Sequence, residues 1–467
     1  MTGKAAIVGG GVIGAGWAAR FLLNGWDVAV ADPDPEAPRK IGEVLDGARR
    51  ALPMLYDRSL PGEGNLTVSD DLEAAVRDAD WIQESVPERL EIKHAVRDRI
   101  EAAASPDALI ASSTSGFKPS ELRQGAARPD RILVAHPFQP VYLLPLVELV
   151  GDGPNDPACV RAATVLDGIG MYPLTVRGEI DAHIADRLLE AVWREALWLV
   201  KDDIATTEEI DEAIRMGFGL RWAQMGLFET YRIGGGEAGM AHFLAQFGPA
   251  LKWPWTKLMD VPELDEALVA KIAAQSDTQA AGLGLRDLER LRDNNLVAIL
   301  RALKAEGAAA GRVMAAHDAR LSRPLADGPP MVTVSRVVPS DWTDYNGHMN
   351  ESRYGQVFSD AADAVMVHVG ADADYVATGK SYFTVETSVR YLEETHAGEA
   401  IFVETRVLVG QGKKLKLGHA MKRASDATVL ATCDQFLLHV SLETRSSCPP
   451  DPEVEAAVER LAACHAD

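Results

Sequence analysis

Cysteine is scarce in this chain of 467 residues, and long apolar runs are absent. The four cysteines, Cys159, Cys433, Cys448 and Cys464, form no C-x-x-C pair. This spacing lacks the usual signature of a zinc site or a redox dithiol, so we expect reduced thiols and no bound metal. No run approaches the ~18 apolar residues of a membrane span. The first predicted strand already begins at Lys4, so we expect no signal peptide. We therefore expect a cytoplasmic protein that does not enter a membrane.

Basic residues are outnumbered by acidic ones. Lys and Arg total 47 against 69 Asp and Glu, which gives a formal net charge of −22. Binding to nucleic acid or to anionic membranes needs clustered basic residues, so we expect neither partner. Hydrophobic residues at 47% and charged residues at 25% are typical of a folded globular chain. At ~150 residues per domain, the length predicts about three domains.

A glycine-rich turn follows the first predicted strand, 5–8. Gly9, Gly11 and Gly14 match G-x-G-x-x-G with Val12 and Ile13 between the last two, and a second strand, 27–31, ends at Asp32. The three glycines permit, in turn, a tight turn, a close approach of the backbone to a pyrophosphate, and close packing of the helix on the strand. The N-terminus of the helix attracts the phosphate groups. Asp32 can accept hydrogen bonds from ribose hydroxyls and would repel a 2′-phosphate. The segment predicts NAD as the cofactor, with a purely structural turn as the alternative.

Three polar clusters follow further predicted strands, at Glu88, at Ser112–Ser115 and at His136. Ligands gather at the carboxyl ends of strands in open α/β sheets. Glu148 lies 12 residues beyond His136, a spacing that suits a hairpin with the carboxylate beside the imidazole. His, Glu and Ser beside a nicotinamide indicate a dehydrogenase, in which the imidazole accepts the alcohol proton and the carboxylate stabilises the imidazolium. A structural His before Pro is the alternative.

Residues 1 to about 320 resemble the 3-hydroxyacyl-CoA dehydrogenase superfamily. The matching motifs are Gly9–Gly14, Glu84-Ser-Val-Pro-Glu88 with Lys93, Ser112-Ser-Thr-Ser115, His136-Pro-Phe, Leu146-Val-Glu148 and Met225-Gly-Leu-Phe-Glu229. The resemblance implies Ser115 as a contact of the substrate oxygen, His136 as the base and Glu148 as its partner. It places Glu88 and Lys93 near the nicotinamide ribose. It also implies an α/β Rossmann domain over 1–180 and an all-α domain over 181–321 that completes the site and forms a homodimer.

One position departs from the pattern of that superfamily: this chain has Asp186 where the superfamily usually has Asn. Asp186, Glu190 and Trp193 share a face of a predicted helix, and such a set suits a quaternary ammonium. A solvated helix face is the alternative. Segments 183–198 and 135–148 resemble the carnitine 3-dehydrogenase branch of the superfamily, which implies NAD-dependent oxidation of the L-carnitine 3-hydroxyl. The candidate donors to the carnitine carboxylate, among which the sequence does not choose, are Lys118, Arg187 and Arg194.

Strand signals nearly vanish between 181 and 321, where segments such as 261–276 and 285–305 show helical spacing. The aromatic-rich stretches 221–231 and 247–255 are expected in a core, an interface or a pocket. A proline-rich linker, 322–330, follows. Residues 331–467 then turn to β composition, which predicts an α+β domain with a helix at 352–368. The predicted strands are 332–338, 382–391, 400–409, 414–422 and 429–440.

The last domain carries the motif Asp341-Trp-Thr-Asp344-Tyr-Asn-Gly347-His348-Met-Asn350 just before that helix. It resembles the hot-dog fold of 4-hydroxybenzoyl-CoA-type thioesterases. The resemblance implies that Asp344 attacks the thioester or activates water, and that helix N–H groups polarise the carbonyl. It places Gly347, His348 and Asn350 at the substrate. A plain turn with Asn350 as helix cap, and a non-catalytic CoA-binding or dimer-forming domain, are the alternatives.

Together the resemblances imply a bifunctional enzyme that acts on two small-molecule substrates. One site oxidises L-carnitine to 3-dehydrocarnitine, and the other hydrolyses a short acyl-CoA, by implication betainyl-CoA, to glycine betaine and CoA. Another 3-hydroxyacyl-CoA or 3-hydroxyacid dehydrogenase with an unrelated thioesterase is one alternative. An NAD-binding structural protein with a non-catalytic hot-dog module is the other. The presence of Ser115, His136 and Glu148 favours an enzyme.

Overall fold

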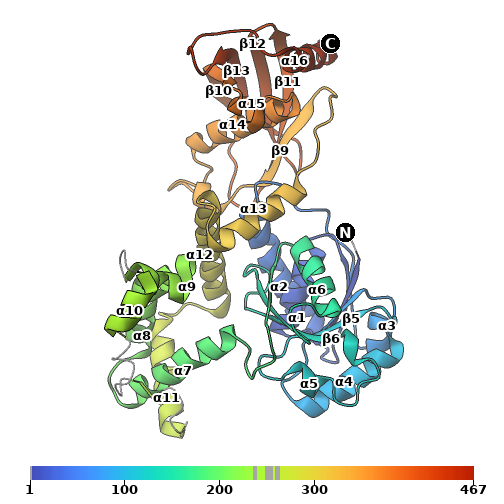
Figure 1. The fold of residues 1–467 in the computed structure, drawn as a ribbon, viewed down its shortest axis with the longest axis vertical. Helices are drawn as coiled ribbons and strands as arrows, with labels where there is room; N and C mark the ends of the chain where they lie inside the picture. Colours follow the sequence, from blue (N-terminus) through green and yellow to red (C-terminus); the bar gives the residue numbers. More distant parts are fainter. Residues whose placement is uncertain (1–2, 235–238, 248–255, 258–262, 264, 467) are drawn as a thin grey trace. The chain divides into compact units, whose positions relative to one another are not determined.

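The computed structural model describes residues 3–234, 239–247, 256–257, 263 and 265–466. Of the aromatic-rich stretch 247–255, all residues but Phe247 therefore lie outside the described residues. The chain divides into two compact units (Figure 1). Unit 1 comprises Met1–Arg49 and Pro61–His317, and unit 2 comprises Arg50–Leu60 and Asp318–Asp467.

Unit 1 contains an eight-stranded sheet in the order β3-β2-β1-β4-β5-β6-β7-β8. Strands β1 to β6 are parallel, β7 is antiparallel to β6, and β8 is parallel to β7. The parallel part has the doubly wound order of a Rossmann domain, as predicted. The strands are β1 (Lys4–Val8), β2 (Asp27–Ala31), β3 (Leu66–Ser69), β4 (Trp81–Glu84), β5 (Leu109–Ser112), β6 (Ile132–Pro137), β7 (Leu146–Val150) and β8 (Tyr172–Thr175). The edge strands β3 and β8 were not predicted, because they are only partly buried and lack a continuous apolar run.

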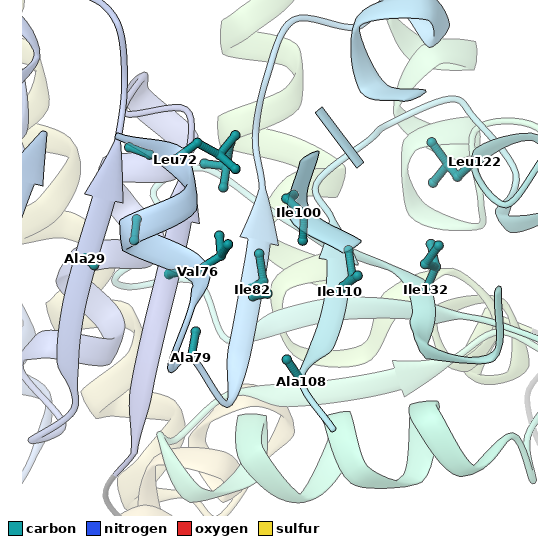
Figure 2. Close-up of a cluster of buried hydrophobic side chains, with 14 of the residues drawn as sticks. Ala29, Leu72, Val76, Ala79, Ile82, Ile100, Ala108, Ile110, Leu122 and Ile132 are labelled. Carbon is teal, nitrogen blue, oxygen red and sulfur yellow. The ribbon is translucent and has the colours of Figure 1, made fainter. Parts of the chain in front are cut away.

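Helices cover this sheet and complete its core. Ile82, Ile110 and Ile132 are register partners on β4, β5 and β6, and Figure 2 shows them in a row in the same cluster as Val76 and Ile100. Each is almost fully buried, which contributes about 1.5–3 kcal/mol per side chain. The packed strands give the polar residues at their carboxyl ends a rigid base. The helices are α1 (Val12–Leu22), α2 (Ala37–Ala51), α3 (Leu72–Val76), α4 (Leu90–Ala103), α5 (Pro119–Leu122) and α6 (Pro157–Gly168).

Between residues 181 and 321, the described residues contain helices and no strand, as predicted. Two buried contacts join these helices to loops of the Rossmann domain: the Tyr142 hydroxyl donates to Asp293 Oδ2 at 2.8 Å, and His317 Nε2 lies 3.0 Å from Asn24 Oδ1. The helices are α7 (Ala185–Lys201), α8 (Thr207–Ala213), α9 (Gly219–Gly234), α10 (Gly239–Phe247), α11 (Glu266–Gln279), α12 (Leu285–Ala305) and α13 (Ala309–Leu321). In the described part of the chain, no helix is both long and apolar enough to cross a membrane.

Unit 2 contains a five-stranded antiparallel sheet in the order β10-β13-β12-β11-β9. Its strands are β9 (Met331–Val337), β10 (Lys380–Tyr391), β11 (Ala400–Gln411), β12 (Lys414–Arg423) and β13 (Val429–Ser441). Helix α14 (Glu351–His368) buries Val357, Phe358 and Ala361 in the core beside the sheet, as the hot-dog prediction requires. The short α15 (Ala373–Ala377) and the terminal α16 (Pro452–Cys464) were not predicted. The signal for α16 was present, because Val454, Val458 and Leu461 are buried at helical spacing.

Residues 50–60 belong to unit 2 although they form the end of α2 and the segment that follows it in the chain. The Asp57 backbone N–H donates to Asp318 Oδ1 at 2.8 Å, and the Asp57 carboxylate lies 3.0 Å from the Arg336 guanidinium. The hydroxyls of Ser59 and Ser335 are 2.7 Å apart. No sequence pattern indicated this excursion. The predicted hot-dog segment alone therefore lacks part of the unit to which it belongs.

Candidate active sites

The glycine-rich turn connects β1 to α1 and is shaped by close backbone contacts. Gly9 has φ +99°, and a Cβ at Gly14 would lie 1.8 Å from the Gly9 carbonyl oxygen. At Gly11, by contrast, a Cβ would meet no atom within 4 Å. Gly11 is also the N-cap of α1, without a side-chain hydrogen bond of its own. An open cradle at a helix N-terminus is the feature that a pyrophosphate requires, so these residues fit a dinucleotide.

Asp32 follows β2 and faces the same turn. Its carboxylate accepts hydrogen bonds from the Gly10 N–H at 2.6 Å and from the Asp34 N–H at 2.8 Å. These two bonds hold the half-buried carboxylate beside the cradle. Because each carboxylate oxygen has more than one acceptor direction, ribose hydroxyls can still donate to it. The residues present thus fit NAD, as predicted.

His136 and Glu148 are direct register partners in the antiparallel pair of β6 and β7. His136 Nδ1 lies 3.1 Å from Glu148 Oε2, and both side chains are buried. The predicted hairpin is therefore present. A carboxylate only accepts, so Nδ1 donates in this bond, and Nε2 is the ring nitrogen left to take a proton from the substrate.

The loop before α7 fixes the other side of the carboxylate. The N–H groups of Ile184 and Ala185 both donate to Glu148 Oε1, each at 2.9 Å. Burial alone would raise the pKa of Glu148, but the bonds from His136, Ala185 and Ile184 outweigh it and lower the pKa below its ordinary value. Glu148 thus stays ionised at neutral pH.

His183, in the same loop, was not predicted as a site residue. It has φ +51°, and its fully buried ring lies 5.5 Å from the His136 ring. Its Nε2 donates to the Thr114 carbonyl at 3.2 Å. Burial lowers the pKa of His183, so the ring is neutral beside the His136–Glu148 pair.

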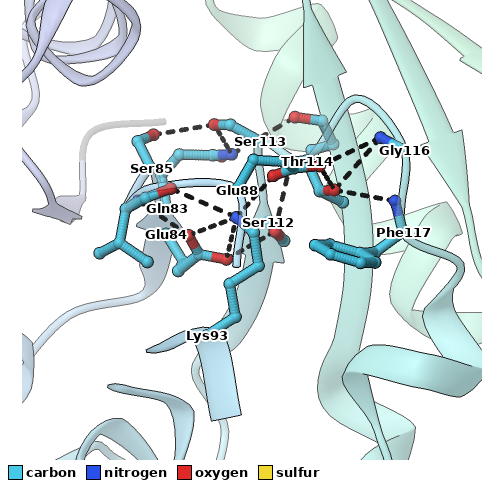
Figure 3. Close-up of polar contacts among 12 residues, drawn as sticks. Gln83, Glu84, Ser85, Glu88, Lys93, Ser112, Ser113, Thr114, Gly116 and Phe117 are labelled. Carbon is cyan, nitrogen blue, oxygen red and sulfur yellow. Dashed lines mark hydrogen bonds and ion pairs between the residues drawn. The ribbon is translucent and has the colours of Figure 1, made fainter. Parts of the chain in front are cut away.

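A polar network locks the loop after β5, as Figure 3 shows. The Lys93 ammonium lies 2.9 Å from Glu84 Oε1 and 3.2 Å from Glu88 Oε2. Ser112 Oγ donates to Glu84 Oε2 at 2.6 Å. Glu88 in turn accepts bonds from the Thr114 hydroxyl and from the Gly116 N–H. The loop that carries Ser115 is therefore held by a chain of charge-assisted bonds.

Three predicted residues occupy different places in this network. Ser115 is exposed at the tip of the loop, and Glu88 is partly exposed. The Lys93 side chain is only 2% exposed, and its ammonium is occupied by the two carboxylates. Lys93 is thus arranged to position Glu88 more than to present a donor at the surface.

The acidic residues of α7 lie at increasing distance along the helix from the His136–Glu148 pair. Asp186 is half-buried in the first turn and directly follows Ala185. Glu190 lies 4.0 Å from Arg194, and Trp193 is 54% exposed. The Ala185 N–H, next to Asp186, donates to Glu148. Among the described contacts, no bond joins Glu190 or Trp193 to Glu148. Of the candidate carboxylate donors, Lys118 pairs with Asp181 at 2.7 Å.

In unit 2, the predicted motif forms a tight turn before α14. The Gly347 N–H donates to the Asp344 carbonyl at 3.0 Å, the Asn346 N–H donates to Asp344 Oδ1 at 2.8 Å, and Gly347 has φ +82°. Asn350 is the N-cap of α14, and its Oδ1 accepts from the Ser352 N–H at 3.0 Å. The turn thus places Asp344 beside the start of the helix.

His348 meets residues of the loop that follows β10. Its Nε2 lies 3.4 Å from Glu394 Oε2, and its ring lies 4.8 Å from the His396 ring. One ligand atom from each of these three side chains lies within 4.8 Å of the others, a spacing that could hold a metal ion. Neither Glu394 nor His396 was predicted, because 46 and 48 residues separate them from His348 in the chain. A cavity of about 610 Å³ adjoins His348 and is lined by Asp344, Asn350, Tyr391 and Glu394 among others.

Known families and relatives match these sites along the whole chain. The model of the 3-hydroxyacyl-CoA dehydrogenase NAD binding domain matches residues 4–180, that of the C-terminal domain matches 183–272, and that of the thioesterase-like superfamily matches 337–458. A Ruegeria pomeroyi protein named L-carnitine dehydrogenase/betainyl-CoA thioesterase is 63% identical over 99% of this chain and 96% of its own. A protein of the same name from Agrobacterium fabrum is 55% identical over 98% and 94%.

The chain belongs to the L-carnitine dehydrogenase/betainyl-CoA thioesterase family.

Membership of the L-carnitine dehydrogenase/betainyl-CoA thioesterase family confirms several predictions. The chain is an enzyme with an NAD-dependent dehydrogenase part and a thioesterase part, and NAD is its cofactor. Among solved structures, FHMPC 5-dehydrogenase, described as an NAD⁺-dependent dismutase, is 26% identical with a TM-score of 0.53. It covers 65% of this chain and 99% of its own, in agreement with the dehydrogenase fold.

Proposed function

We propose that unit 1 oxidises the 3-hydroxyl of L-carnitine to the ketone of 3-dehydrocarnitine. The bond between His136 Nδ1 and Glu148 carries this proposal, because the carboxyl end of β6 lies at the same edge of the sheet as that of β1, which the glycine turn follows. His136 Nε2 accepts the hydroxyl proton, and the ionised Glu148 stabilises the imidazolium. Bound NAD would supply the acceptor for the hydride that leaves the same carbon. The names of the relatives in Ruegeria and Agrobacterium support carnitine as the substrate.

The remaining dehydrogenase residues take supporting roles in this proposal. Gly9, Gly11, Val12, Ile13 and Gly14 hold the pyrophosphate, and Asp32 binds the adenosine ribose. Ser115 donates to the substrate oxygen. Glu88 contacts the nicotinamide ribose, and Lys93 positions Glu88.

Asp186 provides the negative charge for the trimethylammonium group of carnitine. It is half-buried and adjoins the amides that bind Glu148, so it lies closest along α7 to the base. Glu190 and Trp193 extend the same face as an outer part of the cation site. The carnitine carboxylate is bound by Arg187, Arg194 or Lys118, of which Lys118 and Arg194 already pair with acids.

For unit 2 we propose hydrolysis of betainyl-CoA to glycine betaine and CoA. The turn that places Asp344 and the start of α14 on one cavity carries this proposal. N–H groups of the first turn of α14 polarise the thioester carbonyl. Asp344 either attacks the carbonyl carbon or deprotonates the attacking water, and the CoA thiolate leaves. Gly347 allows the turn, His348 and Asn350 lie at the substrate, and Glu394 orients His348.

We also propose that the protein is a homodimer. Helices of unit 1 expose many large apolar side chains, and such surfaces are typical of protein interfaces. They include Leu188, Met216, Leu220, Phe228 and Ile233. Light scattering should then give a mass in solution of twice the chain mass. In the Phe228→Glu variant, the measured mass should fall to that of a single chain.

The domain limits are proposed as 1–180, 181–321 and 331–467 with the linker 322–330, residues 50–60 being added to the last domain.

The proposed compartment is the cytoplasm. Burial raises the pKa of Cys159 and Cys433 to about 12, so these two thiols stay protonated and unreactive at the pH of that compartment.

Two assays on the full-length chain test the two activities separately. NADH formation is measured with L-carnitine, D-carnitine and 3-hydroxybutyrate, and CoA release is measured with betainyl-CoA. His136→Ala should abolish NADH formation with L-carnitine and spare CoA release, whereas Asp344→Ala should do the reverse. NADH from 3-hydroxybutyrate but not from L-carnitine would overturn the carnitine assignment. Loss of both activities in either folded variant would overturn the division into separate sites.

A further inference from the structure

The cavity beside Asp344 is strongly acidic. Four carboxylates line it: those of Asp344, Glu351, Glu393 and Glu394. Its described lining includes no Lys or Arg, and His348 already pairs with Glu394. A neutral acyl chain gains nothing from carboxylates and would have to displace their water. The lining therefore favours an acyl group that carries positive charge.

Two of these carboxylates remain available to such a group. Glu394 pairs with His348, and Asp344 accepts a bond within its own turn. Glu351, in the first turn of α14, and Glu393, just after β10, form no ion pair among the described residues. Within the described part of the chain, no basic side chain therefore neutralises their charge.

Two tyrosine rings complete the same lining. Tyr354 of α14 and Tyr391 at the end of β10 meet edge to face, with ring centroids 5.3 Å apart and planes at 87°. Tyr354 is buried, and its hydroxyl donates to the Glu393 carbonyl at 3.4 Å. The Tyr391 hydroxyl donates to the Glu351 carbonyl at 3.5 Å, while its side chain stays 53% exposed. Tyr354 thus braces Tyr391, which remains open to the cavity.

A quaternary ammonium cannot donate an N–H hydrogen bond, so proteins recognise it by aromatic rings and carboxylates. In a betainyl thioester, one methylene separates the ammonium nitrogen from the thioester carbon. The cation site must then share a cavity with the group that attacks that carbon. Asp344, Tyr391, Glu351 and Glu393 share one.

We propose that Tyr391, Glu351 and Glu393 bind the trimethylammonium group of the acyl moiety and select it over neutral acyl groups. This inference rests on the proposed thioesterase function. The two acids supply the charge, and Tyr391 supplies an aromatic surface. The site is separate from the cation site proposed on α7 for the dehydrogenase.

The test compares two thioesters of the same shape on the full-length chain. Betainyl-CoA carries the charge, and 3,3-dimethylbutanoyl-CoA replaces the nitrogen with carbon. The wild type should favour betainyl-CoA in kcat/KM by about 100-fold, since a cation–π contact and two carboxylates act together. Tyr391→Leu should lower kcat/KM for betainyl-CoA by about 10-fold more than it lowers kcat/KM for the neutral thioester. Tyr391→Phe, which keeps the ring, should stay close to the wild type.

The double variant Glu351→Gln and Glu393→Gln tests the role of the negative charge. It should also lower kcat/KM for betainyl-CoA selectively. Glu459→Gln, an exposed position on α16, is the matched control and should change neither rate. Retained hydrolysis of the neutral thioester shows that each variant is folded. Equal rates on both thioesters in the wild type, or equal losses on both in the variants, would overturn the cation site while the thioesterase stands. Wild-type hydrolysis of other acyl-CoAs but of neither test thioester would instead overturn the proposed substrate and the cation site with it.

Discussion

The Arg336 guanidinium and the Asp57 carboxylate form an ion pair at 3.0 Å although 279 residues separate them in the chain. The Arg336 side chain is buried and also lies 3.0 Å from Asp360 of α14. Its guanidinium packs 5.0 Å from the centroid of the Trp342 ring, next to the thioesterase motif. A segment that follows α2 of the dehydrogenase part thus supplies a charge to the core of unit 2.

Asp57→Ala should therefore destabilise unit 2. Removing one partner of a buried ion pair is costly, but Asp57 is 41% exposed and Arg336 keeps Asp360, so we expect a loss of about 2 kcal/mol in the free energy of unfolding. Hydrogen exchange of the buried amides of unit 2 measures it. Asp46→Ala, which removes an exposed pair with Arg49, should stay within about 0.5 kcal/mol. Equal effects of the two variants would contradict the role of Asp57.

Glu148→Gln should disable the dehydrogenase while leaving CoA release unchanged. An amide has one oxygen where the carboxylate has two, so its NH2 group must face either His136 or the N–H groups of Ile184 and Ala185. We expect a fall in kcat of about 100-fold or more for NADH formation.

The same variant tests the lowered pKa of Glu148. Because the folded-state pKa lies below 4.5, the carboxylate stabilises the fold above about pH 4.5, and this contribution is lost as the pH falls through the folded-state pKa. The stability difference between wild type and Glu148→Gln should therefore shrink in acid. A difference that stays constant with pH would show that the carboxylate's charge does not matter.

His183→Phe tests the neutral imidazole beside His136. The folded-state pKa of His183 is lowered below 6.5, so the unfolded chain takes up the proton first as the pH falls. Its contribution to stability is complete above about pH 6.5 and is lost below that value. As the pH falls through about 6.5, the free energy of unfolding of unit 1, measured in urea, should then decrease less steeply in the variant than in the wild type. Identical slopes would mean that His183 titrates normally in the folded protein.

Local sequence predicted those parts of the fold that local patterns determine. The buried strands are continuous apolar runs, the glycine turn has a fixed spacing, and 12 residues between His136 and Glu148 suffice for a hairpin. Asp57, Tyr391 and Glu393 could not be found in this way. They reach Arg336 or the Asp344 cavity only through tertiary packing, and no motif surrounds them in the chain.

Gly11 and Gly14 should respond differently to the same added methyl group. A Cβ at Gly14 would lie 1.8 Å from the Gly9 carbonyl oxygen, so Gly14→Ala must displace the turn and should cost about 3 kcal/mol of stability. A Cβ at Gly11 meets no protein atom within 4 Å, and Ala is compatible with its φ of −62°. Gly11→Ala should therefore fold nearly as well as the wild type.

The methyl group at position 11 would instead occupy space that the pyrophosphate needs. We expect Gly11→Ala to weaken NAD binding by about 10-fold or more, with little change in the unfolding midpoint measured without NAD. Gly42→Ala on α2, where a Cβ also meets no atom within 4 Å, is the matched control: it should leave NAD binding unchanged and, as a Gly→Ala change inside a helix, raise the stability by about 0.5–1 kcal/mol. Titration of NAD by calorimetry and urea unfolding without NAD separate the two effects. Unchanged NAD affinity in Gly11→Ala would show that the cofactor does not approach this turn, which would remove the cradle from the proposed site.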